Sequence, residues 1–231
     1  MVYLKKAYLL CHSLFILLLT ACEVNTPTKH ISDGNLNGFD YIDLGLSVKW
    51  ATCNIGAKHP EEYGNYYAWG ETKPKSIYHW STYKYCDGEG TKLTKYNYDH
   101  NYGCIDNLIT LFSIDDAAYV NLGDGWRLPT SSEMEELQDN CTWKWTKQEG
   151  VYGYKVTSNK KGYTDKSIFL PAAGYQNWST IDYAGVQGHY WVNRLFHLAP
   201  VSAYEMHFES SALSLDYALR CYGRSIRPVC K

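Results

Sequence analysis

The side chains best suited to recognition gather between residues 175 and 224, toward the C-terminus of the chain. This stretch combines aromatic rings, histidines and arginines, and aromatic and arginine side chains are the usual anchors of interfaces. Flat aromatic rings also stack on sugars, because each ring presents a large apolar face. We predict that the ligand-binding residues are Tyr190, Trp191, Asn193, Arg194, Phe196, His197, His207, Asp216, Tyr217, Arg220 and Tyr222.

The distribution of basic residues changes in the same part of the chain. Lysine is frequent up to Lys166 and then absent until Lys231, whereas four of the five arginines follow Tyr190. Interface cores favour arginine and are depleted in lysine, which supports a binding surface. A half of the domain that is simply buried would show the same change, so the sequence leaves both interpretations open.

Catalytic and metal-binding patterns do not stand out in the sequence. Catalysis needs a nucleophile, an acid and a base within hydrogen-bond reach of one another. The acids Asp115, Asp116 and Glu133 stand instead at helix starts, where carboxylates satisfy free N–H groups. The histidines are scattered and no Cys-x-x-Cys pair occurs, so we predict neither an enzyme nor a metal or cofactor site. A net charge of -2 gives no reason to expect a nucleic-acid partner.

Short strands and two short helices are predicted to position the binding residues. One helix is expected to begin at Ser113 and the other at Thr130, where Thr-Ser-Ser-Glu forms a capping-box pattern. Residues 76–102 lack a clear period and are expected to form a long surface excursion. This pattern predicts a compact α+β domain. The strands are expected at residues 41–46, 48–53 and 63–69 and, beyond Cys141, around Trp143 and Trp145, at 152–157 and at 167–171.

The N-terminus has the form of a bacterial lipoprotein signal. A basic start with Lys5 and Lys6 precedes an apolar run over residues 7–19, which is too short to span a membrane. The run ends in Leu-Thr-Ala-Cys, which resembles the bacterial lipobox, so cleavage is expected before Cys22 and the lipid on its sulfur.

This signal divides the chain into three predicted parts. They are a signal peptide over residues 1–21, a flexible tether over residues 22–38 and a folded domain over residues 39–231. We expect the protein to be exported and lipid-anchored to the cell envelope. The outer membrane is the expected location, and the surface and periplasmic faces both stay open.

Six cysteines follow Cys22, and export would permit disulfides among them. Six cysteines allow fifteen pairings, and the sequence cannot choose among them. Cys86 and Cys104 flank one insertion and could close it, while Cys53 and Cys230 could meet if the terminal strands pair. The remaining two are Cys141 and Cys221.

Seven strings, in their order along the chain, resemble the Fibrobacter succinogenes major paralogous domain of Bacteroides-type lipoproteins. The resemblance covers nearly all of residues 39–231. The strings are residues 48–57 (VKWATCNIGA), 67–71 (YAWGE), 115–118 (DDAA), 125–130 (GWRLPT), 169–174 (FLPAAG), 189–191 (HYW) and 223–229 (GRSIRPV).

This resemblance implies a C-type-lectin-like fold of the kind found in formylglycine-generating enzymes. In that fold the first and last strands pair, and irregular loops on one face recognise the ligand. Trp50, Trp69 and Trp126 would then be core residues. Arg127 and Arg227 would be partly buried and held by acids or carbonyls.

The chain departs from the family at residues 192–197 (VNRLFH), where relatives usually have serines. Neither the metal-binding cysteine pair of formylglycine-generating enzymes nor the sugar-binding strings of calcium-dependent lectins can be mapped onto it. Some proteins with this fold are variable receptors of diversity-generating retroelements. Residues 193–200 and 213–222 fit the amino-acid alphabet that such diversification produces, whereas Glu205, Met206 and Glu209 would be fixed positions.

Together these observations predict a membrane-anchored lipoprotein that binds a glycan or a cell-surface protein through its C-terminal loops. The alternative is a structural lipoprotein of the cell envelope without a specific ligand. An enzyme related to formylglycine generation is a remote third possibility, since fold alone does not specify function.

Overall fold

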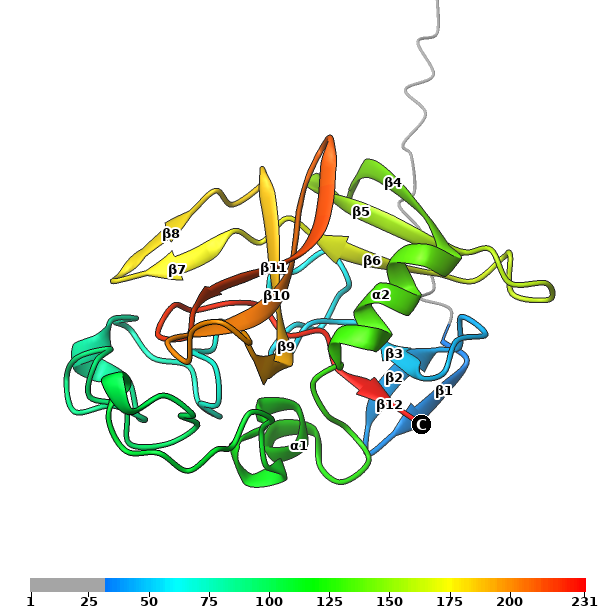
Figure 1. Cartoon of the computed structure of the whole chain (residues 1–231). Helices are drawn as coiled ribbons and strands as arrows, with labels where there is room; N and C mark the ends of the chain where they lie inside the picture. Colours follow the sequence, from blue (N-terminus) through cyan, green and yellow to red (C-terminus); the bar gives the residue numbers. More distant parts are fainter. Residues whose placement is uncertain (1–31) are drawn as a thin grey trace, which may run out of the picture. The chain divides into compact units, whose positions relative to one another are not determined.

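Short antiparallel strands dominate the structure, a computed structural model that describes residues 32–231 (Figure 1). The predicted signal peptide, Cys22 and the first part of the tether lie outside these residues. Two α-helices accompany the strands in the described part, which agrees with an α+β class. The elements are β1 (Gly34–Leu36), β2 (Phe39–Ile42), β3 (Lys49–Ala51), α1 (Ala117–Leu122), α2 (Ser131–Asn140), β4 (Cys141–Gln148), β5 (Val151–Ser158), β6 (Ser167–Pro171), β7 (Tyr175–Asn177), β8 (Thr180–Asp182), β9 (Gln187–Leu195), β10 (Ser202–Glu209), β11 (Ala212–Leu219) and β12 (Val229–Cys230).

The N- and C-terminal ends of the domain share one sheet with the order β1-β2-β3-β12. The last strand pairs with β3, opposite Trp50, and β2 and β3 separate it from β1. The predicted tether extends too far, because β1 already belongs to the fold. Asn37 and Gly38, with φ of 54° and 89°, form the turn of the β1–β2 hairpin, and Asn-Gly is the preferred sequence for such a turn.

Both predicted helices are present, but only one has the predicted cap. Thr130 accepts from the N–H of Glu133, whose carboxylate in turn accepts from the N–H of Thr130, so the capping box is confirmed. Helix α1 is capped by Asp116, whereas Ser113 begins a 3-10 turn. The predicted serine cap is therefore wrong.

The strands after Cys141 are confirmed as the sheet β4-β5-β6. The strand predicted at 63–69 is wrong, since this segment makes a single bridge between Tyr67 and Arg224. The predicted surface excursion at 76–102 contains short 3-10 turns and isolated β-bridges, without an α-helix or a strand of the named sheets. Four of its tyrosines are nevertheless buried in the core, at positions 78, 83, 85 and 96.

Two buried clusters form the core, one around Trp69, Trp126 and Trp191 and the other around Trp50 and Phe208. The three tryptophans expected to be core residues from the resemblance are therefore buried.

The resemblance implies that Arg127 and Arg227 are held by acids or carbonyls, and the structure shows an acid for the first and carbonyls for the second. Arg127 makes two bonds to the carboxylate of Glu133, of 2.8 and 2.5 Å. Arg227 is fully buried and donates to the carbonyl oxygens of Ala51, Thr52 and Phe169.

All six cysteines of the described part are free thiols. Leu93 pairs with Cys86 on one side and with Gly103 on the other. Neighbouring strands lie about 4.8 Å apart, so the backbones flanking Leu93 are separated by about 9–10 Å. A disulfide requires a Cα separation below about 7 Å, which explains why Cys86 and Cys104 do not pair. Over residues 32–231, no helix is long and apolar enough to cross a bilayer.

Candidate functional site

Most of the predicted binding residues lie on or beside the sheet β11-β10-β9. Tyr204 pairs with Tyr217, and the adjacent Glu205 pairs with Asp216. Because successive side chains of a strand point to opposite faces, the predicted residues separate into two groups. One face carries Tyr204 and Tyr217, and the other carries a group of charged and polar side chains beside the buried Trp191.

The first group forms an aromatic patch, which we define as Phe196, His197, Leu198, Tyr204 and Tyr217. The rings of Phe196 and Tyr217 stack with centroids 3.8 Å apart and an interplanar angle of 11°. Nδ1 of His197 lies 2.5 Å from the hydroxyl of Tyr204. Tyr217 is 51% exposed and Leu198 is 73% exposed, so the patch is accessible from solvent.

The second group forms a polar face on the opposite side of the sheet. We define it as the charged and polar side chains of the three strands that point away from Tyr204 and Tyr217. His189 of β9 stands opposite His207 of β10, and their rings stack 4.6 Å apart. The polar face comprises Gln187, His189, Glu205, His207, Glu209, Ser214 and Asp216.

A buried ion pair joins Arg224 to Glu205 of the polar face. Nε of Arg224 is 2.6 Å from Oε2 of Glu205, and Oε1 of the same carboxylate is 3.2 Å from Nδ1 of His189. Burial alone would raise the pKa of Glu205, but Arg224 and His189 outweigh it and hold that pKa below its usual value. Glu205 is therefore an anion that fixes both neighbouring side chains.

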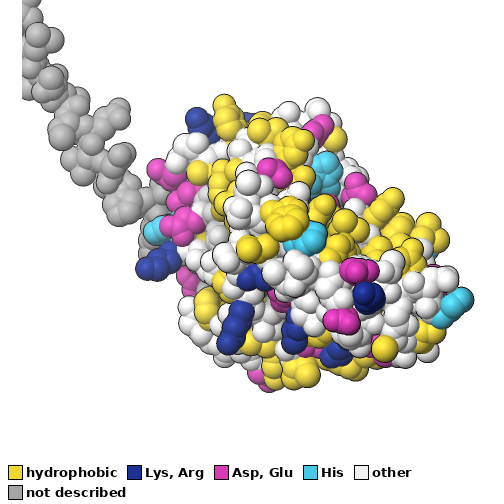
Figure 2. Space-filling view, turned by 90° about the vertical axis from the view of Figure 1, so that its left-hand side faces the viewer, with side chains coloured by type: hydrophobic (Ala, Val, Ile, Leu, Met, Phe, Trp, Pro, Cys, Tyr) yellow, Lys and Arg dark blue, Asp and Glu magenta, His cyan; other side chains and the backbone are white. Residues whose placement is uncertain are grey.

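Three tyrosines, which we call the tyrosine row, lie beside this ion pair. Tyr175 stacks on Tyr183 and on Tyr222, with interplanar angles of 25° and 17°. The ring of Tyr175 also covers the guanidinium of Arg224 at 4.4 Å and meets His189 edge-on. Tyr183 is 54% exposed. Figure 2 looks onto the side where the β7–β8 hairpin projects, and hydrophobic and histidine side chains lie close together there.

Three predicted binding residues are buried and out of reach of a ligand in this conformation. Tyr190 donates to the carbonyl of Pro171, and the indole of Trp191 donates to the carbonyl of Tyr67. Arg220 is fully buried and bonds to loop carbonyls. These side chains hold the fold together, as the buried-half interpretation of the sequence expects.

The other eight predicted residues are at least partly exposed. Phe196, His197 and Tyr217 belong to the aromatic patch, and His207 and Asp216 belong to the polar face. Tyr222 stands in the tyrosine row. The backbones of Asn193 and Arg194 pair with residues 110–111 at the edge of β9, apart from both groups.

Two partly exposed residues outside the predicted set are Tyr204 in the aromatic patch and Tyr175 in the tyrosine row, and the buried Glu205 of the polar face is also outside it. The alternation of Glu205, His207 and Glu209 at every second position could have identified the polar face, because this period places all three on one side of a strand.

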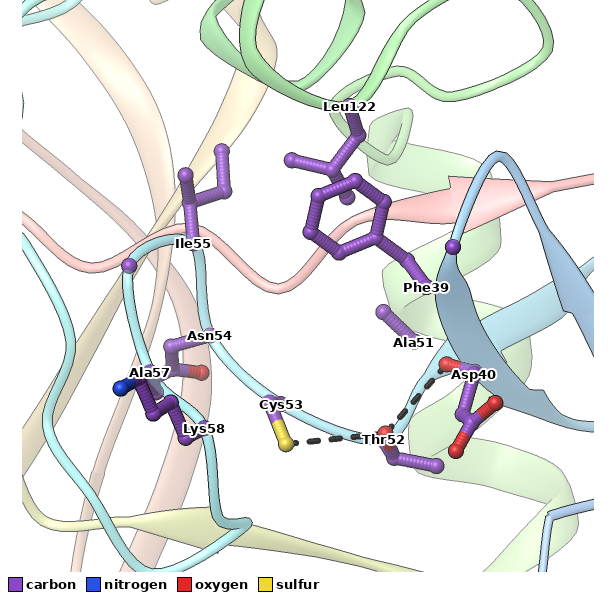
Figure 3. Close-up of a pocket in the computed structure, with 12 residues that line it drawn as sticks. Phe39, Asp40, Ala51, Thr52, Cys53, Asn54, Ile55, Ala57, Lys58 and Leu122 are labelled. Carbon is purple, nitrogen blue, oxygen red and sulfur yellow. Dashed lines mark hydrogen bonds between the residues drawn. The ribbon is translucent and has the colours of Figure 1, made fainter.

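A pocket of about 300 Å³ lies elsewhere in the fold, between β2, the segment after β3 and the end of α1. Phe39, Ile55 and Leu122 gather at one end, and Cys53 and Thr52 lie at the other (Figure 3). Burial raises the pKa of the Cys53 thiol. The thiol therefore stays protonated near neutral pH and is a weak nucleophile, so the pocket has the size of a small binding site without an activated cysteine.

The pH dependence of stability should report on His189. Its pKa is lowered chiefly by burial, with Glu205 opposing the shift. A histidine whose pKa is lowered by folding contributes stability at pH values above its unfolded pKa of about 6.5. This contribution is lost as the pH falls below that value. The measurement is the free energy of unfolding in urea at pH 7.5 and at pH 5. Between these pH values we expect the His189→Gln variant to lose less stability than the unchanged protein, by on the order of 1 kcal/mol. Parallel pH profiles of the two proteins would contradict a neutral His189.

No group of histidine, cysteine and acidic side chains within residues 32–231 has the arrangement of a metal site. Comparison with known proteins found no matching family model, no matching curated protein and no matching solved structure. The function must therefore be inferred from the sequence and from the geometry of the sheet.

Proposed function

We propose that the protein is an exported lipoprotein, anchored through Cys22, that binds a protein ligand through the aromatic patch. The observation that carries this proposal is the stack of Phe196 on the half-exposed Tyr217. A partner that packs against the exposed face of this stack would bury a large apolar area. Binding requires no catalytic group.

The chemistry of the patch favours a protein over a sugar. Aromatic rings are typical hot-spot residues of protein interfaces, where they bury large area at low entropic cost. The nearest acid in sequence, Asp216, is directed to the opposite face of the sheet, so the patch itself contains no carboxylate to accept sugar hydroxyls. An apolar protein surface would cover Leu198 as well as the rings.

The proposal includes a C-type-lectin-like fold whose surface is diversified. The two stretches with the diversification alphabet, residues 193–200 and 213–222, are joined in space by the stack of Phe196 on Tyr217. A surface assembled from two variable segments suits a receptor for changing partners. Deep sequencing of the gene in a population grown from one cell should then show changes concentrated in these codons. A uniform 3′ end would refute diversification and leave a fixed receptor.

Replacing Tyr217 by alanine should remove binding to cells that display the ligand. We expect at least a tenfold loss in the saturable binding of full-length protein, in detergent micelles, to a panel of intact cells. Truncation of an aromatic anchor typically costs about 2 kcal/mol or more. Tyr152→Ala on β5 is the matched control, because Tyr152 is also a half-exposed tyrosine.

Treatment of the cells separates the alternatives. Loss of binding after protease digestion of the cell surface would support a protein ligand, whereas loss only after glycan removal would indicate a sugar. Absence of saturable binding across the panel would favour the structural lipoprotein. The anchor is tested by feeding an alkyne-labelled fatty acid, which should label the protein and not its Cys22→Ser variant.

A further inference from the structure

The polar face contains hydrogen-bonding atoms that the fold leaves unused. Nη1 of Arg224 and Nε2 of His207 are buried and have no hydrogen-bond partner among the described residues. Arg224 is only 4% exposed. An unpaired buried donor is costly, so a ligand atom that accepts a hydrogen bond from it stabilises the complex. We propose that the polar face and the tyrosine row form a second binding site, whose ligand is a neutral sugar.

The balance of donors and acceptors suits hydroxyl groups. A hydroxyl both donates and accepts hydrogen bonds. Asp216 offers acceptors at the partly exposed edge of the face, and Arg224 offers a free donor in its interior. His207, between them on β10, can either donate or accept a hydrogen bond. The three side chains together therefore offer both the donors and the acceptors that sugar hydroxyls need.

The local charge disfavours an anionic ligand. Glu205 neutralises Arg224 within the buried ion pair. The charged groups that remain around the face are acids, Asp216 and Glu209 on the sheet and Asp182 opposite Tyr175 on the hairpin. A carboxylate or sulfate on the ligand would meet this negative charge, so we expect uncharged sugars to bind better than acidic ones.

The tyrosine row supplies the apolar half of the site. The C–H face of a pyranose packs against an aromatic ring, and Tyr183 presents such a ring at the surface. Tyr175 lies directly over Arg224 and is itself partly exposed. Because this ring covers the guanidinium, the proposal requires the Tyr175 side chain to rotate away when a ligand bonds to the free Nη1. The site lies on the face of the sheet opposite the aromatic patch and does not depend on the function of that patch.

The test is a titration of full-length protein in detergent micelles with two sets of oligosaccharides. The first set contains neutral gluco-, manno-, galacto- and xylo-oligosaccharides, and the second contains uronic-acid oligosaccharides of equal length. We expect at least one neutral set to bind with a dissociation constant below 1 mM, about the upper end of useful affinities, and the acidic set to bind about tenfold more weakly. Tyr183→Ala and Asp216→Asn, both at exposed or partly exposed positions, should each weaken binding about tenfold, whereas Tyr152→Ala should not.

Three outcomes would overturn this assignment. They are no binding by any neutral set, equal or tighter binding of the acidic set, and sugar binding that is unaffected by Tyr183→Ala and Asp216→Asn. Near-ultraviolet circular dichroism of each variant shows that a loss of binding is not a loss of fold. The sugar site and the protein receptor can be refuted separately, because the receptor proposal is tested through Tyr217 on the other face of the sheet.

Discussion

Arg220→Met should unfold the protein or leave it barely stable. The guanidinium of Arg220 donates to the hydroxyl of Tyr83 and to the carbonyl oxygens of Lys95, Tyr96 and Pro200, at 2.7–2.9 Å. Methionine fills much of the volume but leaves the three carbonyl oxygens without this donor, while the Tyr83 hydroxyl keeps its bond to the carbonyl of Trp69. At about 1 kcal/mol or more per unsatisfied group, we expect a loss of roughly 4 kcal/mol, a large part of the usual 5–15 kcal/mol of a domain.

The measurement is the free energy of unfolding in urea at neutral pH. Arg194→Met is the matched control, because the Arg194 side chain is exposed, and its cost should stay within about 0.5 kcal/mol. Arg220→Lys should recover only part of the loss, since an ammonium has three donors where the guanidinium has five. If Arg220→Met were as mild as Arg194→Met, Arg220 would not be what ties residues 76–102 to the sheet.

Gly188→Ala should destabilise the fold by about 3 kcal/mol, at the upper end of the usual cost of overpacking a core. A Cβ on Gly188 would lie 2.0 Å from Cζ of Phe208, the residue opposite it on β10. Phe208 cannot yield, because it is fully buried and its ring packs among Tyr154, Tyr190 and Trp143. The φ of Gly188 is not in the left-handed region, so the effect is steric.

A double-mutant cycle distinguishes this clash from a general intolerance of the strand. Phe208→Leu alone should cost stability by leaving space, and it should cost much less when Gly188 is already alanine. The coupling energy between the two changes should exceed about 1 kcal/mol, the usual range for residues in contact. Strict additivity of the two losses, measured by urea unfolding, would show that Phe208 is not the obstacle.

Local signals in the sequence predicted the elements whose stability is local. The capping box at Thr130 and the alternation after Cys141 specify α2 and the strands β4 and β5 without reference to distant residues. The turn of the β1–β2 hairpin is equally readable from Asn37 and Gly38, but the predicted tether over residues 22–38 includes both β1 and this turn. Composition had obscured the turn signal there.

The excursion at 76–102 could not be read in the same way, because its burial depends on distant partners. The hydroxyl groups of Tyr85 and Tyr96 donate to Asp115, and the backbone carbonyl of Tyr96 accepts from Arg220. Contacts between residues so far apart leave no periodic pattern in the sequence. A tyrosine whose polar tip finds a partner behaves as a core residue, although a polar, irregular segment looks like a surface loop.

The candidate binding residues were predicted as a group but not as two sites. Composition identified the stretch that contains them and could not separate buried Trp191 from exposed Tyr217. Adjacent residues such as Glu205 and Tyr204 reach opposite faces only once the strand and its partners are known. Nη1 of Arg224 lacks a partner because of the three-dimensional packing around it, and no pattern in the sequence indicates this.

The pairing of β12 with β3 has a consequence for how the chain reaches its native state. Residues 229–230 complete a sheet that begins near residue 34, and Arg227 supplies donors to carbonyls at residues 51 and 52. Contacts of such large sequence separation form slowly, because loop closure must precede them. A chain emerging from a ribosome would hold an unfinished N-terminal sheet until residues 229–230 arrive. Truncation by even a few C-terminal residues would leave that edge open and exposed to association with other chains.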